Sequence, residues 1–286
     1  MSHETYHANV RSVSRSMLAD FIESPAIYHG RYVAKTLERQ SETHAMAMGT
    51  LTHCAVLQGE RLDSMLAVIP DSLLSDDGGL RTKAAKEWKT AQQALGKIVV
   101  KAHDADNQLA DIVGMRDAVL GVAVATDSGV RVRLREDIFQ RHGVAIETPF
   151  DWVDTESGFP MRAMPDAMVI IDGNAIIVDV KTIADINRAE FAIADSYWLQ
   201  VAHYTEGVAA AHGVPTDRCL FLFVFVEKSA PYRTRVMQMS ANMKAKALEE
   251  WRVAVSQLHD RITRDDWNDW RSGELIVVDR FIKGIQ

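Results

Sequence analysis

The D-G-N tripeptide at positions 172–174 separates two stretches rich in apolar residues, 159–171 and 175–182. A short turn of this composition between apolar stretches is typical of a β-hairpin, so the sequence predicts two paired strands here. The second stretch reads AIIVDVKT, and Asp179 and Lys181 interrupt its apolar run two positions apart. Side chains at this spacing project from the same face of a strand. The hairpin therefore places a carboxylate and an ammonium side by side in an apolar setting.

The rest of the chain predicts a single α/β domain over residues 1–286, with a mainly helical part over 1–128 and a sheet-containing core over 129–286. Apolar residues at helical spacing predict helices over 12–33, 45–59, 76–93 (after an initial loop), 104–125, 184–213 (with a break near Ser196) and 243–262. Alternating or continuous apolar runs predict strands over 143–154, 159–171, 175–182, 219–228 and 234–240. We therefore expect a mixed sheet flanked by helices.

Composition narrows the classes of function. The formal net charge is −7, so a nucleic-acid partner would need a local basic patch. Two cysteines are too few for a disulfide framework or a four-thiolate metal site. The longest apolar run, CLFLFVFV, is too short to span a bilayer, and the first ten residues lack the pattern of a signal peptide. We therefore expect a cytoplasmic protein without a membrane partner.

Acidic residues in the predicted hairpin form a candidate metal site. Asp166, preceded by Pro165, lies on the first strand, while Asp179 and Lys181 lie on the second. These polar groups can converge at one end of the sheet, and paired carboxylates suit a hard divalent cation such as Mg²⁺. A nearby lysine can orient a water molecule and offset charge on a phosphate. The alternative is an ordinary salt bridge between Asp179 and Lys181 on a solvated face.

Further polar residues could join this centre. Gln200 and Tyr204 are four residues apart on the next predicted helix and share one face. His53 lies on an apolar helix, and Glu147 lies on the strand before Asp166. Each of these residues, taken alone, is also typical of an ordinary structural position, so the residues themselves leave both interpretations open.

In sequence order, these residues form a five-part pattern. Its parts are G-T-x-x-H at 49–53, Glu147, P-D at 165–166, D-V-K at 179–181 and Q-x-x-x-Y at 200–204. The pattern resembles the PD-(D/E)xK nuclease superfamily, its RecB-like branch, and most closely the RecE-type exonucleases, the family of the exonuclease eight nuclease domain. Segments 5–33 and 79–100 also resemble that family, so the resemblance extends over most of the chain.

The resemblance implies a divalent-metal centre. By their positions in the pattern, Asp166 and Asp179 would be metal ligands, the Val180 carbonyl would contribute, and His53 would lie at the metal. The ion would be Mg²⁺, which Mn²⁺ can replace. Relatives with an iron–sulfur cluster carry Cys-Pro where this chain has Ser-Pro at 24–25, and the C-terminal region has no cysteine cluster. We therefore expect no iron–sulfur cluster.

The remaining parts of the pattern would complete a catalytic centre. By resemblance, Lys181 would be the catalytic lysine, and Glu147 would be an outer or second-metal carboxylate. Gln200 and Tyr204 would contact the DNA strand end or organise the site.

Basic residues that could hold the DNA backbone lie outside the pattern. Arg162 is the best single candidate, because it shares the predicted strand of the first carboxylate and alternates onto the same face. The other candidates are Arg81, Lys83 and Lys86, together with Trp88, which could stack on a base. The alternative is a solvated basic helix with one packed tryptophan.

Together, the residues and the resemblance predict a Mg²⁺-dependent exonuclease that acts on double-stranded DNA ends. The resemblance implies 5′ to 3′ digestion that leaves 3′ overhangs for a RecT-like single-strand annealing protein, as in recombination of the phage type. It also implies a ring-shaped homo-oligomer, expected to be a tetramer, in which only the channel must be positive. Two alternatives stay open: an endonuclease or a flap or single-strand nuclease on the same fold, and a catalytically inactive module that recruits a recombinase to DNA.

Overall fold

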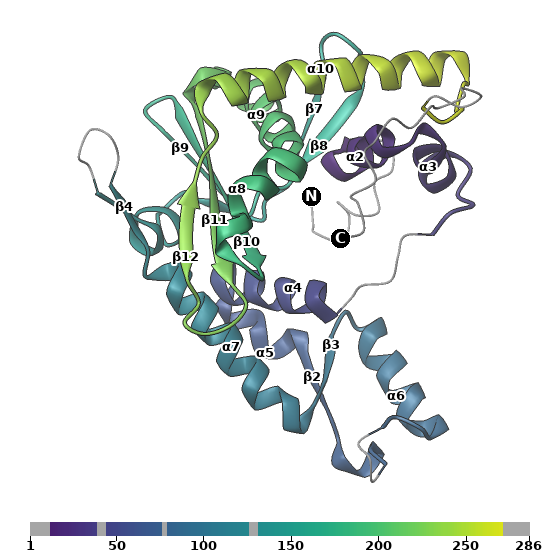
Figure 1. Cartoon of the computed structure of the whole chain (residues 1–286), viewed down its shortest axis with the longest axis vertical. Coiled ribbons are helices and arrows are strands. Elements are labelled where there is room, and N and C mark those ends of the chain that lie inside the picture. The colour runs from purple at the N-terminus through teal and green to yellow at the C-terminus, as the bar shows by residue number, and fades with distance from the viewer. Residues whose placement is uncertain (1–11, 39–43, 76–78, 126–130, 271–286) are drawn as a thin grey trace, which may run out of the picture.

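A five-stranded mixed sheet forms the centre of the protein (Figure 1). The computed structural model describes residues 12–38, 44–75, 79–125 and 131–270. The sheet has the order β12-β11-β10-β9-β6, with strands at Ala145–Ile146 (β6), Ala167–Ile171 (β9), Asn174–Ile183 (β10), Cys219–Glu227 (β11) and Thr234–Met237 (β12). β10 pairs in parallel with β11 and antiparallel with β9, so it is the central strand.

Helices cover both faces of this sheet (Figure 1). One face carries α2 (Arg15–Glu23), α9 (Trp198–His212) and α10 (Ala241–Arg264), and the other carries α4 (His44–Leu57) and α7 (Ala102–Leu120). Alternate side chains of β10 and β11 enter each layer, which produces two apolar cores. Burial on both faces explains why these strands read as continuous apolar runs. The predicted α/β class, a mixed sheet flanked by helices, is confirmed.

The β9–β10 hairpin is also confirmed. Ile171 pairs with Asn174 across the turn, and Asp172 and Gly173 have positive φ angles of 48° and 74°. Two consecutive residues of this kind match a type I′ turn, whose twist fits that of paired strands. Asp and Gly occupy this backbone region more readily than most residues.

Two of the predicted strands are wrong, because each is two strands in different sheets. The stretch 143–154 contains β6 and β7, and the stretch 159–171 contains β8 and β9. The second sheet has the order β1-β8-β7, with strands at Val13–Ser14 (β1), Phe150–Val153 (β7) and Pro160–Ala163 (β8). Each break contains a proline, Pro149 or Pro165, which cannot donate a ladder hydrogen bond. The chain therefore changes sheets at both prolines.

Short strands in the N-terminal half were not predicted from their pattern. They are β2 (Leu66–Ile69), β3 (Ile98–Lys101) and β4 (Ala123–Ala125). β5 (Arg131–Arg133) is different, because the stretch 130–137 alternates with period two in the sequence, a pattern that indicates a strand, although its arginines could also line the end of a helix. β2 pairs in parallel with β3, and α6 (Lys83–Ala94) lies between them in the sequence. β4 pairs with β5, so the helix predicted over 104–125 ends before β4. β2, β3 and β4 have only three or four residues each, which is too short for a periodic pattern to emerge.

Short helical turns connect these elements. They are α3 (Pro25–Tyr28), α5 (Leu62–Met65) and α8 (Ala189–Ala192), the π-helices η1 (His29–Val33), η4 (Leu134–Phe139) and η6 (Ile193–Tyr197), and the 3-10 helices η2 (Gly59–Arg61), η3 (Asp71–Leu73), η5 (Ile186–Arg188) and η7 (Thr216–Arg218). η6 lies directly before α9 and contains Ser196, where the sequence predicted a break. Single π-helical turns within helices are frequent at functional sites.

α10 has 24 residues, but charged and polar side chains occur along its whole length. Over the residues that the structure describes, none of the helices combines the length and the apolar content needed to cross a lipid bilayer.

Candidate active site

Asp166 and Asp179 lie opposite each other at the end of the β9–β10 hairpin. The ladder between these strands ends with Ala167 opposite Val178, so the two aspartates are the next opposed residues. A hydrogen bond holds Asp166 in this position, because Val180 N donates to Asp166 Oδ2 over 2.7 Å. Strand register and this bond together bring the two predicted carboxylates to one place on the sheet.

Lys181 lies beside Asp179 on the same face of β10. Its Nζ forms an ion pair with Asp179 Oδ2, and the side chains of Lys181 and Asp179 are only 16% and 2% exposed. Gln200, on α9, donates a hydrogen bond from Nε2 to Asp179 Oδ1. The pair therefore lies in the protein interior beneath α9, and not on the solvated face that the alternative interpretation required.

His53 reaches the same centre from α4. Its Nδ1 lies 3.3 Å from Asp166 Oδ2. α4 approaches β10 closely at Gly49, where a Cβ atom would lie 3.5 Å from Thr182 Oγ1. The G-T-x-x-H segment therefore packs on the strand that carries the D-V-K segment.

The charges in this centre are strongly coupled. Burial lowers the pKa of His53, but the charge of Asp166 and the hydrogen bond to it outweigh burial, so the pKa is raised. Burial raises the pKa of Asp166, but His53, Lys181 and a backbone N–H outweigh it, so the pKa is lowered. Burial also raises the pKa of Asp179, and Lys181 offsets this effect only in part. The negative charge of Asp179 is therefore incompletely compensated.

Two buried oxygens in this centre fit a hard divalent cation. Asp179 Oδ2 and Gln200 Oε1 are buried without a hydrogen-bond partner, although the former contacts the Lys181 ammonium. Asp166 and Asp179 supply the carboxylate oxygens that Mg²⁺ prefers. In the described ranges, no three His, Cys, Asp or Glu side chains converge closely enough to form a metal cluster. Water and substrate would therefore complete the ligand shell, as is usual for Mg²⁺.

Glu147 adjoins Asp166 along the backbone, while its carboxylate is held by the end of α4 and the turn after it. Glu147 N donates to the Asp166 carbonyl over 3.0 Å. Gln58 Nε2 donates to Glu147 Oε2 over 2.5 Å, and Arg61 Nη1 donates to Gln58 Oε1 over 2.5 Å. The sequence analysis missed Gln58 and Arg61. The available signal was weak, since Gln58 merely follows His53 by five residues.

Gln200 and Tyr204 both face the sheet from α9 but contact different parts of the centre. Tyr204 is 9% exposed, and its hydroxyl donates to the Met164 carbonyl over 3.2 Å. Tyr204 therefore organises the segment that leads into Asp166. Tyr197, which the sequence analysis missed, lies three residues before Gln200, and its ring centroid is 5.1 Å from Lys181 Nζ. The recurrence at 197, 200 and 204 was a signal that could have found it.

The basic residues predicted to hold DNA lie in two separate regions (Figure 1). Arg162 is on β8. The sequence analysis predicted that Arg162 and Asp166 share one strand, and this prediction is wrong because the chain changes sheets between them. Its side chain is also buried, at 6% exposure. Arg81, Lys83 and Lys86 are exposed and line an open hollow of about 690 Å³ along α6, and Trp88 is half-buried on the same helix.

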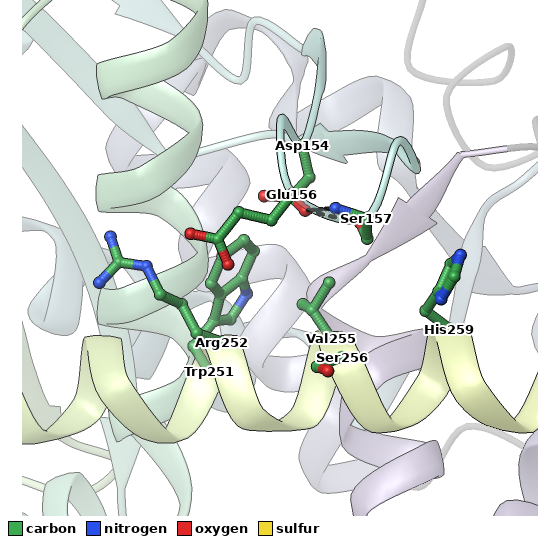
Figure 2. Close-up of a pocket in the computed structure, with 8 residues that line it drawn as sticks. All are labelled: Asp154, Glu156, Ser157, Trp251, Arg252, Val255, Ser256 and His259. Carbon is green, nitrogen blue, oxygen red and sulfur yellow. Dashed lines mark hydrogen bonds between the residues drawn. The ribbon is translucent and has the colours of Figure 1, made fainter.

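A smaller hollow of about 90 Å³ lies elsewhere, between α10 and the turn that joins β7 to β8 (Figure 2). Figure 2 shows Trp251, Arg252 and His259 on α10 facing Asp154 and Glu156 of the turn. None of the residues that line it belongs to the five-part pattern. This hollow is therefore separate from the carboxylate centre.

The fold and the carboxylate–lysine centre define a PDDEXK-like domain. A family model described as "PDDEXK-like domain of unknown function (DUF3799)" matches residues 14–275, so the chain belongs to this family. No curated protein matches the chain.

Solved structures resemble this fold at low sequence identity. A crystal structure named "Putative exonuclease", from Eubacterium rectale, aligns over 98% of this chain and 96% of that chain, with 14% identity and a TM-score of 0.53. This similarity supports the fold alone. The crystal structure of SSO0001 aligns over 82% of this chain and 93% of that chain, with 11% identity and a TM-score of 0.29, which is too low to carry an argument.

Proposed function

We propose that this protein is a metal-dependent deoxyribonuclease that degrades DNA from its ends. The observation that carries the proposal is the placement of Asp166 opposite Asp179, with Lys181 beside Asp179 on the same face of β10. Hydrolysis of a phosphodiester needs an activated water, a Lewis acid and a cation that offsets charge on the phosphate. Two carboxylates and a lysine at one strand end can provide this combination.

Asp166, Asp179 and the Val180 carbonyl would hold Mg²⁺, or Mn²⁺ in its place, with His53 beside Asp166. A bound ion of this kind polarises the phosphate and lowers the pKa of a water ligand. The Asp166 carboxylate is already oriented by the Val180 N–H, so little rearrangement is needed to bind the ion. The incompletely compensated charge of Asp179 favours a cation at this position.

Lys181 is the group that orients the attacking water and offsets the negative charge that builds on the phosphate. Gln200 keeps Asp179 oriented through its amide hydrogen bond. Glu147, held by Gln58, would act as an outer or second-metal carboxylate. Tyr204 fixes the backbone before Asp166 through the Met164 carbonyl.

DNA contact is assigned to the exposed basic residues of the α6 region. Arg81, Lys83 and Lys86 can pair with phosphates, and Trp88 can stack on a base if its half-buried ring turns outward. Their exposure makes them better candidates than the buried Arg162. A local patch of this kind also suits a chain whose formal net charge is −7.

The proposal extends to the substrate and partners that the RecE-type pattern implies. These are double-stranded DNA ends, digestion from 5′ to 3′, and 3′ overhangs passed to a RecT-like annealing protein. A ring-shaped homo-oligomer, proposed as a tetramer, would enclose the DNA and concentrate the positive charge of an acidic chain in its channel. The protein from Eubacterium rectale that shares this fold is named "Putative exonuclease", and the proposed attack on DNA ends agrees with that name.

The test is degradation of linear duplex DNA with Mg²⁺ by the wild type and by Lys181→Ala, with closed circular DNA beside it. We expect nucleotide release from linear DNA by the wild type, loss of this release in Lys181→Ala, and intact circular DNA. Lys246→Ala is the matched control, because Lys246 is an exposed lysine on α10 that pairs with Glu249 and Glu250 on the same helix. Its activity should equal that of the wild type.

Other outcomes would select the alternatives. Cleavage of the circular DNA would favour an endonuclease on the same fold. Wild type that binds DNA but releases no nucleotide with Mg²⁺ or Mn²⁺ would favour a recruitment module. Labels placed at the 5′ or the 3′ end then determine polarity, because the label at the end attacked first is released first.

A further inference from the structure

The Lys181 ammonium contacts an aromatic ring as well as a carboxylate. Its Nζ lies 5.1 Å from the ring centroid of Tyr197, and it forms an ion pair with Asp179. A cation at this distance over an aromatic face is attracted by the negative charge of that face. The Lys181 side chain is 16% exposed, so water weakens this attraction only in part.

Tyr197 and Gln200 lie three residues apart and point toward the same strand, β10. Tyr197 is the last residue of η6, and Gln200 follows it by three residues on α9. Residues at this spacing point in similar directions. Gln200 contacts Asp179, and Tyr197 contacts Lys181, so neighbouring side chains of the continuous η6–α9 segment contact both polar residues of β10.

Buried phenylalanines fix the position of the Tyr197 ring. Its centroid lies 5.6 Å from that of Phe223 and 6.1 Å from that of Phe225, both on β11 and both fully buried. In the parallel ladder, Phe223 is paired with Asp179 and Phe225 with Lys181. The Tyr197 ring therefore packs on Phe223 and Phe225, which are the β11 neighbours of Asp179 and Lys181.

We propose that Tyr197 is a positioning residue that holds the Lys181 ammonium in the centre through its ring face. Lysine has a flexible four-carbon stem, so one ion pair leaves its ammonium several alternative positions. Any cation that takes the oxygens of Asp179 competes with Lys181 for them. A ring face attracts the ammonium without occupying a carboxylate oxygen, so Lys181 stays in place when Asp179 has another partner.

The catalytic meaning of this contact rests on the proposed function, but the contact itself can be measured separately. Lysine side chains labelled with ¹³C give signals for the Cε methylene, and Lys181→Arg identifies the signal of Lys181. A ring face shifts nearby nuclei upfield. We expect an upfield Lys181 signal in the wild type and in Tyr197→Phe, and a normal position in Tyr197→Leu.

Kinetics on linear duplex DNA supply the second measurement. Tyr197→Phe retains the ring and should keep kcat within about twofold, whereas Tyr197→Leu should lose about tenfold in kcat with little change in KM. Phe191→Leu is the matched control, because Phe191 is an exposed aromatic residue on α8, at 63% exposure. It should match the wild type in both measurements.

Distinct results would overturn the proposal. If the Lys181 signal has the same position in Tyr197→Leu and the wild type, the ring does not hold the ammonium. If Tyr197→Phe is as slow as Tyr197→Leu, the hydroxyl is the important group and the ring-face account is wrong. If even the wild type fails to degrade DNA, the proposed function falls, and the Lys181 signal still decides whether the Tyr197 ring lies against the Lys181 side chain.

Discussion

Trp251 Nε1 donates a hydrogen bond to His203 Nδ1 over 3.1 Å, in the interior between α10 and α9. The other ring nitrogen, Nε2, lies 2.9 Å from the Arg162 carbonyl oxygen. An indole N–H can only donate and a carbonyl can only accept, so His203 is neutral with its proton on Nε2. Burial lowers the pKa of His203 to about 4, against the raising effect of the bond to the Arg162 carbonyl and with a further lowering by Arg15.

We predict that neutral His203 contributes stability that is lost as the pH falls below about 6.5. The pKa of His203 is depressed from 6.5 to about 4 by folding, so the unfolded chain takes up this proton first. The stability from neutral His203 is therefore complete above the unfolded pKa and is lost as the pH falls toward the folded pKa. The loss by pH 4.5 is about 2 to 3 kcal/mol. Urea unfolding measured across this pH range checks it.

His203→Gln is the matched control for this prediction. Glutamine can donate to the Arg162 carbonyl and accept from Trp251, but it does not titrate. Its free energy of unfolding should fall less than that of the wild type over the same range. An equal fall in both proteins would mean that other groups cause the acid sensitivity.

We predict that one residue inserted into β9 between Val169 and Ile170 abolishes nuclease activity. The insertion shifts the register by one position or forms a bulge, and in either case Asp166 leaves its place opposite Asp179. One residue inserted beside Gly173 is the control, because a longer turn can preserve the register. Circular dichroism would verify folding of both proteins. Full activity after the β9 insertion would mean that strand register does not position the carboxylates.

Gln58→Leu is expected to lower metal-dependent DNA hydrolysis by at least about tenfold, the usual loss when a residue that orients a ligand is removed. Arg61 can only donate and the Glu147 carboxylate can only accept, so the Gln58 amide has one satisfactory orientation. Its loss frees the carboxylate to move. Mn²⁺ titration calorimetry and rates on linear DNA check this prediction. Gln257→Leu, on the exposed side of α10, should change neither quantity.

Gly207→Ala should destabilise the protein by about 1 to 3 kcal/mol through overpacking. α9 packs against β7 at this position, and a Cβ atom on Gly207 would lie 2.7 Å from Trp152 Cζ3 and 3.0 Å from Phe150 Cε2. Urea unfolding provides the measurement. At Gly59 a Cβ atom would meet nothing within 4 Å, so Gly59→Ala should stay close to the wild type. If Gly207→Ala and the wild type have equal free energies of unfolding, then α9 and β7 can move apart without loss of stability.

The polar residues of the hairpin were predictable because strand pairing follows from local sequence. Once the D-G turn is recognised, the register places Asp166 opposite Asp179 without further information. β10 and β11 were predictable for a different reason, since strands buried on both faces are apolar throughout. The α9 face was predictable at Gln200 and Tyr204, whose spacing is regular.

The rest of the site depends on contacts that no local pattern reveals. Gln58 meets Glu147 across 89 positions of the chain, and such a pairing has no periodic signature. The change of sheet at Pro165 was missed because apolar residues continue on both sides of it, so the stretch 159–171 resembles one strand. Arg162 was misplaced for the same reason: alternation across a break does not preserve a shared face.

The β2–α6–β3 segment has a consequence for how this protein can vary. β2 and β3 pair with each other, and α6 packs mainly on β3, at a distance from the hairpin in Figure 1. The chain therefore leaves the rest of the fold through β2 and returns through the neighbouring β3, and insertions between adjacent points of this kind are well tolerated. Helix α6 and its cations form an exchangeable module. If α6 holds DNA as proposed, its replacement would alter which nucleic acids are bound and leave the carboxylate–lysine centre unchanged.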